Sequence, residues 1–95
     1  MQDPSLLILA SLADGDKHGY AMMEDIERFA GVRLGPGTLY GAITRMDEQG
    51  WIRAVQTSDR RQPYSITVQG KALLKEQLDQ LGRITRTAIV RLRKA

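Results

Sequence analysis

The chain has 95 residues, the size of one domain, and its 42% of hydrophobic and 26% of charged residues are typical of a folded protein. It contains no cysteine, which excludes disulfides, thiolate metal sites and a thiol nucleophile. The formal net charge is +3, and residues 82–95 hold five basic residues and no acidic one. A basic surface favours polyanions such as nucleic acid, although cations at a helix end also complement the helix dipole.

The longest apolar stretch, Leu6 to Ala13, is too short to span a membrane. No basic residue precedes it and Asp14-Gly15-Asp16 follows it, which argues against a signal peptide. Because cysteine is absent as well, we expect a cytoplasmic protein that makes no contact with a membrane.

Two short helices are predicted at the start of the chain. Asp3-Pro4 is a typical N-cap and first helical residue, and Asp14-Gly15-Asp16 ends the first helix. The second helix starts between Asp16 and His18 and ends at Gly31. The residues expected on its buried face, which recur at helical spacing, are Met22, Met23, Ile26, Phe29 and Ala30.

A short β-prone segment at 32–34 precedes the third predicted helix. This helix has two candidate starts: Pro36 with Gly35 as a weak cap, or a later residue capped by Thr38. It ends at Gly50. Its inward-facing residues are Leu39, Ile43 and Met46.

Two alternating runs at 51–56 and 63–68, joined by the polar segment 57–62, predict a β-hairpin. The side chains that share one face of the second run are those of Tyr64, Ile66 and Val68. Thr67 is also a candidate cap for the next helix, which is long, free of proline and predicted over 69–92.

The predicted order is therefore helix, helix, short strand, helix, hairpin and long helix. Three helices followed by a two-stranded hairpin form a winged helix-turn-helix, so the expected fold class is mainly α with a small β-hairpin. In this arrangement the third helix enters the major groove of DNA and the hairpin tip is the wing. We expect residues 1–68 to form the DNA-binding domain and residues 69–95 to form a dimerisation helix continuous with it.

The outward face of the third helix carries short hydroxyl groups and one guanidinium. Such groups bind phosphates near a helix start, and arginine also bonds guanine. A glycine on this face leaves room for close approach of the DNA, whereas a plain amphipathic helix is the structural alternative. The residues on or near this face are Thr38, Tyr40, Gly41, Thr44 and Arg45.

The polar loop of the hairpin carries two adjacent arginines, Arg60 and Arg61, flanked by Ser58 and Gln62. At a wing tip such arginines reach a row of phosphates or a narrow minor groove. Asp59 partly offsets their charge, and a solvated turn is the structural alternative.

The last helix has an apolar stripe with the spacing of a heptad seam, so we expect it to pair with a second copy of the chain. The stripe consists of Leu74, Leu78, Leu81, Thr85, Ala88 and Leu92, widened by Ile84 and Ile89. The alternative is that the stripe packs on the first helix of its own chain. The two arrangements are compatible if the first turns of the last helix pack on the core and the rest pairs with a second chain. A two-fold dimer would place two recognition helices about one DNA turn (~34 Å) apart.

Residues suited to catalysis are few. His18 is the only histidine, and its place at the start of the second helix predicts a structural hydrogen bond. The acids Glu24, Asp25 and Glu27 have no partner histidines for a metal site. We therefore predict that the chain is not an enzyme and uses no metal or cofactor.

Three segments resemble the PadR-like transcriptional regulators, a family of bacterial winged helix-turn-helix proteins. They are 6–20, which ends in His18-Gly19-Tyr20; 35–52, which opens with Gly35-Pro36-Gly37-Thr38-Leu39-Tyr40; and 60–71, the wing and the entry into the last helix. The resemblance implies a homodimeric DNA-binding repressor whose C-terminal helix dimerises. The residues expected to contact DNA are Gly37, Thr38, Tyr40, Gly41, Thr44, Arg45, Ser58, Arg60, Arg61, Gln62 and Tyr64.

The sequence departs from the family pattern at Gly35, where serine is frequent, at Gly41, where proline is frequent, and at Trp51, where leucine is common. Some members bind flat aromatic compounds through an aromatic residue of the last helix. Here that helix has no aromatic residue, so a small-molecule effector has no support from the sequence.

The function expected is sequence-specific binding of double-stranded DNA by a homodimer on a near-palindromic operator, with repression of transcription as the outcome. Winged helices also serve as protein docking domains, so a protein-interaction module without specific DNA binding is the alternative. Binding to the promoter upstream of its own gene would separate the two.

Overall fold

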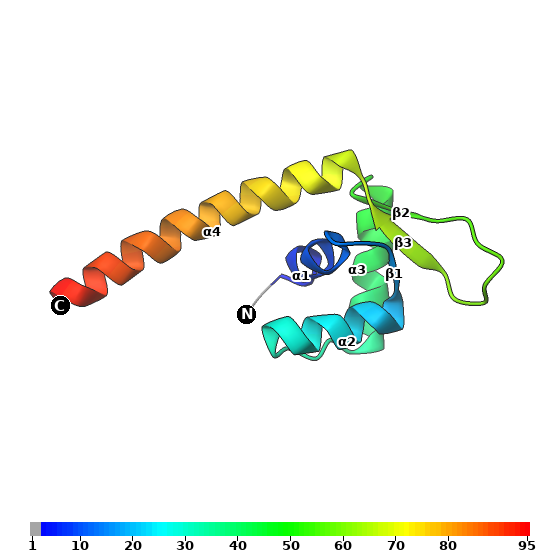
Figure 1. Cartoon of the computed structure of the whole chain (residues 1–95), viewed down its shortest axis with the longest axis horizontal. Helices are drawn as coiled ribbons and strands as arrows, with labels where there is room; N and C mark the ends of the chain where they lie inside the picture. Colours follow the sequence, from blue (N-terminus) through cyan, green and yellow to red (C-terminus); the bar gives the residue numbers. More distant parts are fainter. Residues whose placement is uncertain (1–2) are drawn as a thin grey trace.

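The chain folds as a three-helix unit beside a small sheet, followed by one long helix (Figure 1). A computed structural model describes residues 3–95, so the first two residues of the predicted unit 1–68 lie outside the described part. The elements are α1 (Pro4–Leu12), β1 (Lys17–His18), α2 (Gly19–Ala30), α3 (Pro36–Glu48), β2 (Ile52–Ala54), β3 (Pro63–Ile66) and α4 (Val68–Lys94). The predicted winged helix-turn-helix class, mainly helical with a small antiparallel sheet, is confirmed.

Side-chain caps start three of these helices. The Ser5 N–H donates to Asp3 Oδ1 at 2.9 Å at the start of α1, and the Gly70 N–H donates to Thr67 Oγ1 at 3.0 Å at the start of α4. His18 caps α2, which confirms its predicted structural role. In α3, Gly35 is the N-cap residue and makes no side-chain bond, so the helix takes the earlier of its two predicted starts, at Pro36.

The sheet contains one strand that the sequence analysis missed. Its order is β1-β3-β2, with both pairs antiparallel, and Lys17 lies opposite Tyr64 in the β1–β3 pair. The strand predicted at 32–34 is wrong, because that segment has no strand partner among the described residues. Instead the chain folds back at Gly31, whose φ of 68° suits glycine, and the side chain of Leu34 packs into the core.

Two side chains expected inside are exposed. Phe29 is 50% exposed in the last turn of α2, and Leu34 from the following segment is buried in the core instead. Val68 is 81% exposed because Thr67 ends the strand run and caps α4, which makes Val68 the first helical residue rather than the last strand residue.

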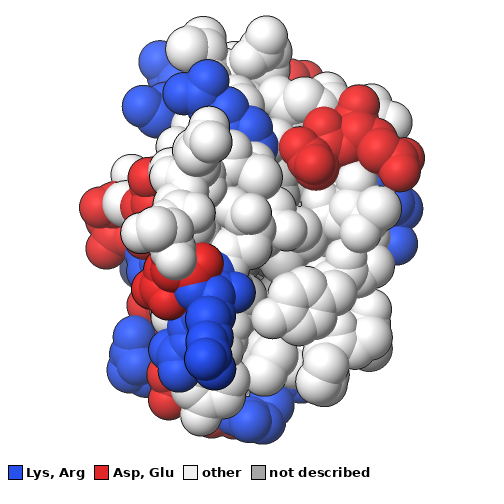
Figure 2. All heavy atoms as spheres, turned by 90° about the vertical axis from the view of Figure 1, so that its right-hand side faces the viewer, with Lys and Arg blue, Asp and Glu red and all other residues white. Residues whose placement is uncertain are grey.

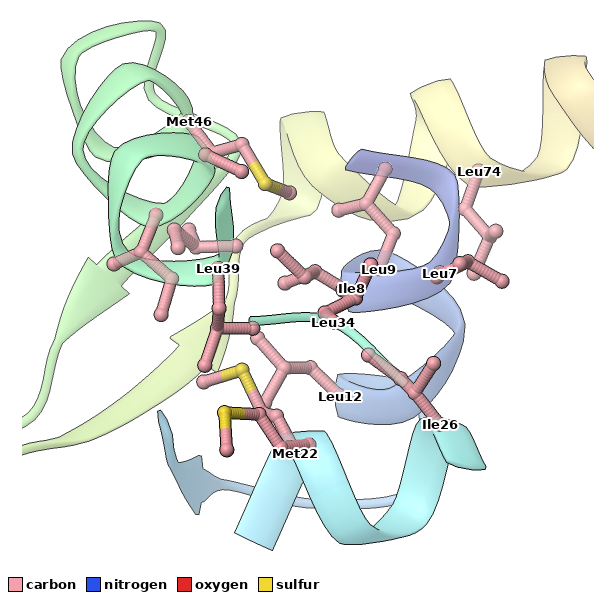
Figure 3. Packing of buried hydrophobic residues seen from close by; sticks show 14 residues of the cluster. Leu7, Ile8, Leu9, Leu12, Met22, Ile26, Leu34, Leu39, Met46 and Leu74 are labelled. Carbon is pink, nitrogen blue, oxygen red and sulfur yellow. The ribbon is translucent and has the colours of Figure 1, made fainter. Parts of the chain in front are cut away.

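The core lies where α1, α2 and α3 meet under the first turns of α4 (Figure 3). α1 is apolar on all sides and supplies four of its members, whereas α2 and α3 each supply one apolar face. Trp51 is half-buried at the margin of this cluster and is not one of its buried members. The fully packed members are Leu7, Ile8, Leu9, Leu12, Met22, Met23, Ile26, Leu34, Leu39, Ala42, Ile43, Met46, Ile52 and Leu74.

The wing and α4 are joined by a close backbone contact. The Thr67 N–H donates to the carbonyl oxygen of Trp51 at 3.1 Å, and the Thr67 hydroxyl donates to the carbonyl oxygen of Gly50 at 2.6 Å. Gly70 lies one turn later with its Cα against the same Trp51 carbonyl, where no side chain would fit. A glycine at this place lets α4 start directly on the turn that precedes β2.

The molecule is elongated, 56 × 26 × 20 Å, because α4 continues well beyond the body formed by the other elements (Figure 1). Its first turns pack on α1, and its second half has no other element beside it. Over residues 3–95, none of the helices combines the length and the apolar character needed to cross a bilayer.

Candidate nucleic-acid interface

A cleft of about 490 Å³ opens where the start of α2, the first half of α3 and the wing come together. Its lining residues are His18, Gly19, Tyr20, Tyr40, Arg60, Arg61, Gln62 and Tyr64. Five of these were predicted as DNA contacts from two separate segments, and the fold brings those segments to one place. His18, Gly19 and Tyr20 were not predicted as contacts, and they join the cleft because β1 pairs with β3.

His18 links the cleft to the backbone of α2. The Ala21 N–H donates to His18 Nδ1 at 3.2 Å, and the other ring nitrogen, Nε2, lies 3.3 Å from Nη1 of Arg61. The start of α2 therefore holds the ring at Nδ1, and Nε2 faces the wing.

Tyr40 reaches across from α3 and lies on the backbone of Gly19. A Cβ atom at Gly19 would overlap the Tyr40 hydroxyl and would come within 2.6 Å of its ring Cζ. Glycine at this position therefore allows the exposed Tyr40 side chain to extend over the start of α2 and into the cleft.

The phenol of Tyr64 stays protonated in this setting. Its pKa is raised above the ordinary value, first by burial and then by the negative charges of Asp47 and an ionised Tyr40. The Tyr64 hydroxyl is consequently a hydrogen-bond donor throughout the neutral range, as a group that contacts an anion must be.

The wing is shaped by Gln62. Its side-chain nitrogen donates to the carbonyl oxygens of Val55 and Pro63, both at 2.8 Å, so these donors hold the base of the loop. Arg60, Arg61 and Ser58 are all exposed beyond that base. The structure thus leaves Arg60, Arg61 and Ser58 exposed to a ligand, with Arg61 also beside the His18 ring, and gives Gln62 an internal role.

On α3 the predicted contact residues outside the cleft line the exposed side of the helix. Thr38 and Arg45 are exposed, and the space beside Gly41 is open except for the end of the Arg45 side chain. The Thr44 hydroxyl donates to the carbonyl oxygen of Tyr40 at 3.0 Å, which occupies its proton within the helix. Gly37 is exposed in the first turn, with open space around it.

Charge on this end of the molecule is divided rather than uniform. Figure 2 shows Lys and Arg side chains mainly along its left and lower sides with acidic side chains among them, a compact acidic group at the upper right, and uncharged surface between the two sides. Among the described residues that line the cleft, none is acidic. The cleft itself is therefore suited to an anion, although its wider surroundings include acids such as Asp59.

The predicted seam of α4 divides into a packed part and an exposed part. Leu74 is 8% exposed and belongs to the core of its own chain, so it is not available to a second chain, and the free stripe begins at Leu78. The apolar residues left exposed beyond it are Leu78, Leu81, Ile84, Ile89, Val90 and Leu92. The other predicted seam residues, Thr85 and Ala88, are also exposed.

Comparison with known proteins settles the family. Residues 8–76 match the sequence profile of the transcriptional regulator PadR-like family, which covers more than half of the chain. The chain belongs to the PadR-like family. Its regulators act in transcription and bind DNA, so the prediction that the chain is not an enzyme is confirmed.

Two relatives by sequence differ in length. The chain is 39% identical over 83 residues to an uncharacterized 37.1 kDa protein of transposon TN4556 from Streptomyces fradiae; the match covers 87% of this chain but only 24% of that protein. It is 31% identical over 87 residues to transcriptional regulator Rv3488 of Mycobacterium tuberculosis, covering 88% of this chain and 80% of that one. This PadR-like chain thus spans about a quarter of the first relative and most of the second.

Solved structures show the same fold. A PadR family transcription regulator from Clostridium difficile has a TM-score of 0.82 at 24% identity, with 88% of this chain and 92% of that chain covered. A transcriptional regulator from Clostridium thermocellum has a TM-score of 0.78 at 26% identity, with 90% and 85% covered. The PadR-like winged helix is therefore the fold of this chain.

Proposed function

We propose that this PadR-like regulator is a repressor that binds a near-palindromic DNA operator as a homodimer. The observation that carries the proposal is the cleft, in which Tyr40 of α3 and Arg60 and Arg61 of the wing line one surface. A winged helix-turn-helix inserts α3 into the major groove while its wing follows the adjacent backbone, so both must face one side of the protein. The proposal also puts the protein in the cytoplasm, where the DNA of a bacterial cell lies.

Within this proposal, the exposed face of α3 supplies base readout. Arg45 can form a bidentate bond with guanine, and Thr38 lies in the first turn of the helix, where hydroxyls and free N–H groups meet a phosphate. The open space beside Gly41 lets the helix approach the groove closely. The arginines of the wing supply contacts that do not depend on sequence.

The exposed stripe of α4 supports the dimer. Five apolar side chains on or beside the predicted seam beyond Leu74 are exposed along one unaccompanied helix, and full burial of such a side chain contributes about 1.5–3 kcal/mol. A two-fold pair would present two copies of α3 to half-sites about one turn apart.

Selection of bound duplexes from a random pool tests the function. We expect an inverted repeat whose half-sites are about 10 base pairs apart, and repression of a reporter whose promoter overlaps that repeat. A pool without enrichment at low salt would contradict specific recognition and favour the docking-module alternative.

Removal of both wing arginines should weaken binding to any duplex. In Arg60→Ala/Arg61→Ala we expect the slope of log affinity against log salt to flatten by up to about 2 per chain, because each phosphate contact contributes about 0.9. Fluorescence anisotropy over a salt series measures this slope. Arg93→Ala/Lys94→Ala removes two charges at the far end of α4 and should leave the slope unchanged; equal slopes in both variants would exclude the wing from the contact surface.

Displacement of Tyr40 should reduce DNA binding without unfolding the protein. Gly19→Ala places a methyl group where the end of the Tyr40 side chain lies, and that exposed side chain is free to swing away. We expect duplex affinity to fall about three- to tenfold and the free energy of unfolding to change by less than about 1 kcal/mol. Tyr40→Phe, which removes only the hydroxyl, should give a loss of the same order; an unaffected Gly19→Ala would place Tyr40 outside the interface.

A further inference from the structure

We infer that His18 and Arg61 form a binding site for a phosphate group, in which the histidine ring donates through Nε2. The inference rests on the proposed function for the source of that phosphate, the DNA backbone. This site gives His18 a second role besides capping α2. The inference follows from the contacts that the two ring nitrogens of His18 make with the Ala21 N–H and with Arg61.

The helix cap fixes the tautomer of the ring. Because the Ala21 N–H donates to Nδ1 at 3.2 Å, Nδ1 carries a lone pair, and a neutral imidazole then carries its proton on Nε2. That tautomer is set by the start of α2, so it is in place before any ligand binds.

The partner on the other side of the ring is also a donor. Arg61 Nη1 lies 3.3 Å from Nε2, and a guanidinium has only donors. Two N–H donors this close do not bond to each other, but both can donate to one oxygen that lies against the pair. One oxyanion can therefore accept from both side chains, and arginine is over-represented where phosphate is recognised.

The rest of the cleft fits the same ligand. Arg60 adds a second positive charge, and the hydroxyls of Tyr40 and Tyr64 add further donors to the lining. No carboxylate belongs to the lining over residues 3–95, and the nearby charge of Asp47 acts on the Tyr64 side of the cleft. A phosphate has several acceptor oxygens, so it can accept hydrogen bonds from more than one of these side chains at once.

Nitrogen-15 NMR of the ring tests the inference directly, because His18 is the only histidine and gives one pair of ring signals. At mildly alkaline pH we expect the Nε2–H tautomer in the free protein. The Nδ1–H tautomer would overturn the inference, since Nε2 would then accept from Arg61 and the contact would be purely internal.

Two ligands distinguish the source of the phosphate. A shift of the Nε2 signal with duplex DNA but not with millimolar inorganic phosphate supports the DNA backbone as ligand, and a shift with inorganic phosphate supports a site that also takes a free anion. If the protein binds no duplex, the proposed function fails, whereas a ring that still responds to phosphate keeps the site. A ring that responds to neither overturns it.

Two substitutions separate capping from ligand binding. His18→Asn keeps a strong N-cap acceptor for Ala21 but cannot reach the position of Nε2, whereas His18→Gln reaches further and caps poorly. On whichever ligand the wild type binds, we expect His18→Asn to lose about tenfold in affinity with an unchanged unfolding midpoint. His18→Gln should show the reverse, a lower midpoint with affinity closer to wild type. Wild-type affinity in His18→Asn would overturn the inference.

Discussion

Replacement of Leu78 by aspartate is expected to turn the proposed dimer into a monomer and to lower affinity for a two-half-site operator at least about a hundredfold. Leu78 is 52% exposed in the single chain and is not a member of its core, and it lies on the seam by which two α4 helices would pair. Two-fold symmetry removes the side chain twice, at about 1.5–3 kcal/mol each, and a carboxylate buried in the same place costs several kcal/mol more. A monomer also loses the gain from bivalent binding, which reaches 10²–10⁴.

Val90→Asp is the matched control for this variant. Val90 is similarly exposed, at 48%, on the same helix, but it occupies the heptad position that points away from the seam. We expect Val90→Asp to remain dimeric by sedimentation analysis and to bind the operator as the wild type does. Both variants should bind a single half-site alike. A Leu78→Asp protein that dimerises normally at micromolar concentration would rule out the seam.

Features that depend on near neighbours in the sequence were predicted well. Asp3-Pro4 and Pro36 start helices where the capping rules put them, and Thr67 caps α4 as the second of its two predicted roles. The apolar spacing of Leu39, Ile43 and Met46 also gave the buried face of α3 correctly. Caps and helical periodicity act within one or two turns, so the sequence carries them directly.

Features that depend on distant partners were missed. β1 has only two residues, too few for any alternation, and it exists because Lys17 and His18 pair with the wing more than 40 residues later. The segment 32–34 has strand-forming residues but pairs with no strand among residues 3–95, and it contributes Leu34 to the core instead. The contribution of His18 and Tyr20 to the cleft follows from the same pairing. The only local signal was the His18-Gly19-Tyr20 run itself, which fits a helix start equally well.

Substitution of Gly70 by alanine is expected to lower the free energy of unfolding by about 2–6 kcal/mol. A Cβ at this position would overlap the carbonyl oxygen of Trp51 and lie 2.9 Å from Ile66 Cγ1. The carbonyl cannot move away cheaply, because it accepts from the Thr67 N–H at 3.1 Å and belongs to the turn between α3 and β2. Overpacking of this kind costs about 1–3 kcal/mol, and loss of a buried backbone hydrogen bond adds about 1–3 kcal/mol.

Gly41→Ala makes the same chemical change where there is room for it, because the nearest neighbour of the new Cβ is the end of the Arg45 side chain at 3.5 Å. There the higher helix propensity of alanine should raise the free energy of unfolding by about 0.5–1 kcal/mol. Urea unfolding of both variants measures the difference between their free energies of unfolding. Both are measured at one protein concentration, because dimerisation would make the apparent stability depend on concentration. Opposite signs are expected from one substitution type, because only at Gly70 does a carbonyl from a different element occupy the space of the methyl group. If Gly70→Ala were as stable as the wild type, α4 would not need to start directly on the Trp51 carbonyl. The direction in which α4 leaves the body would then be set by its packing on α1 alone.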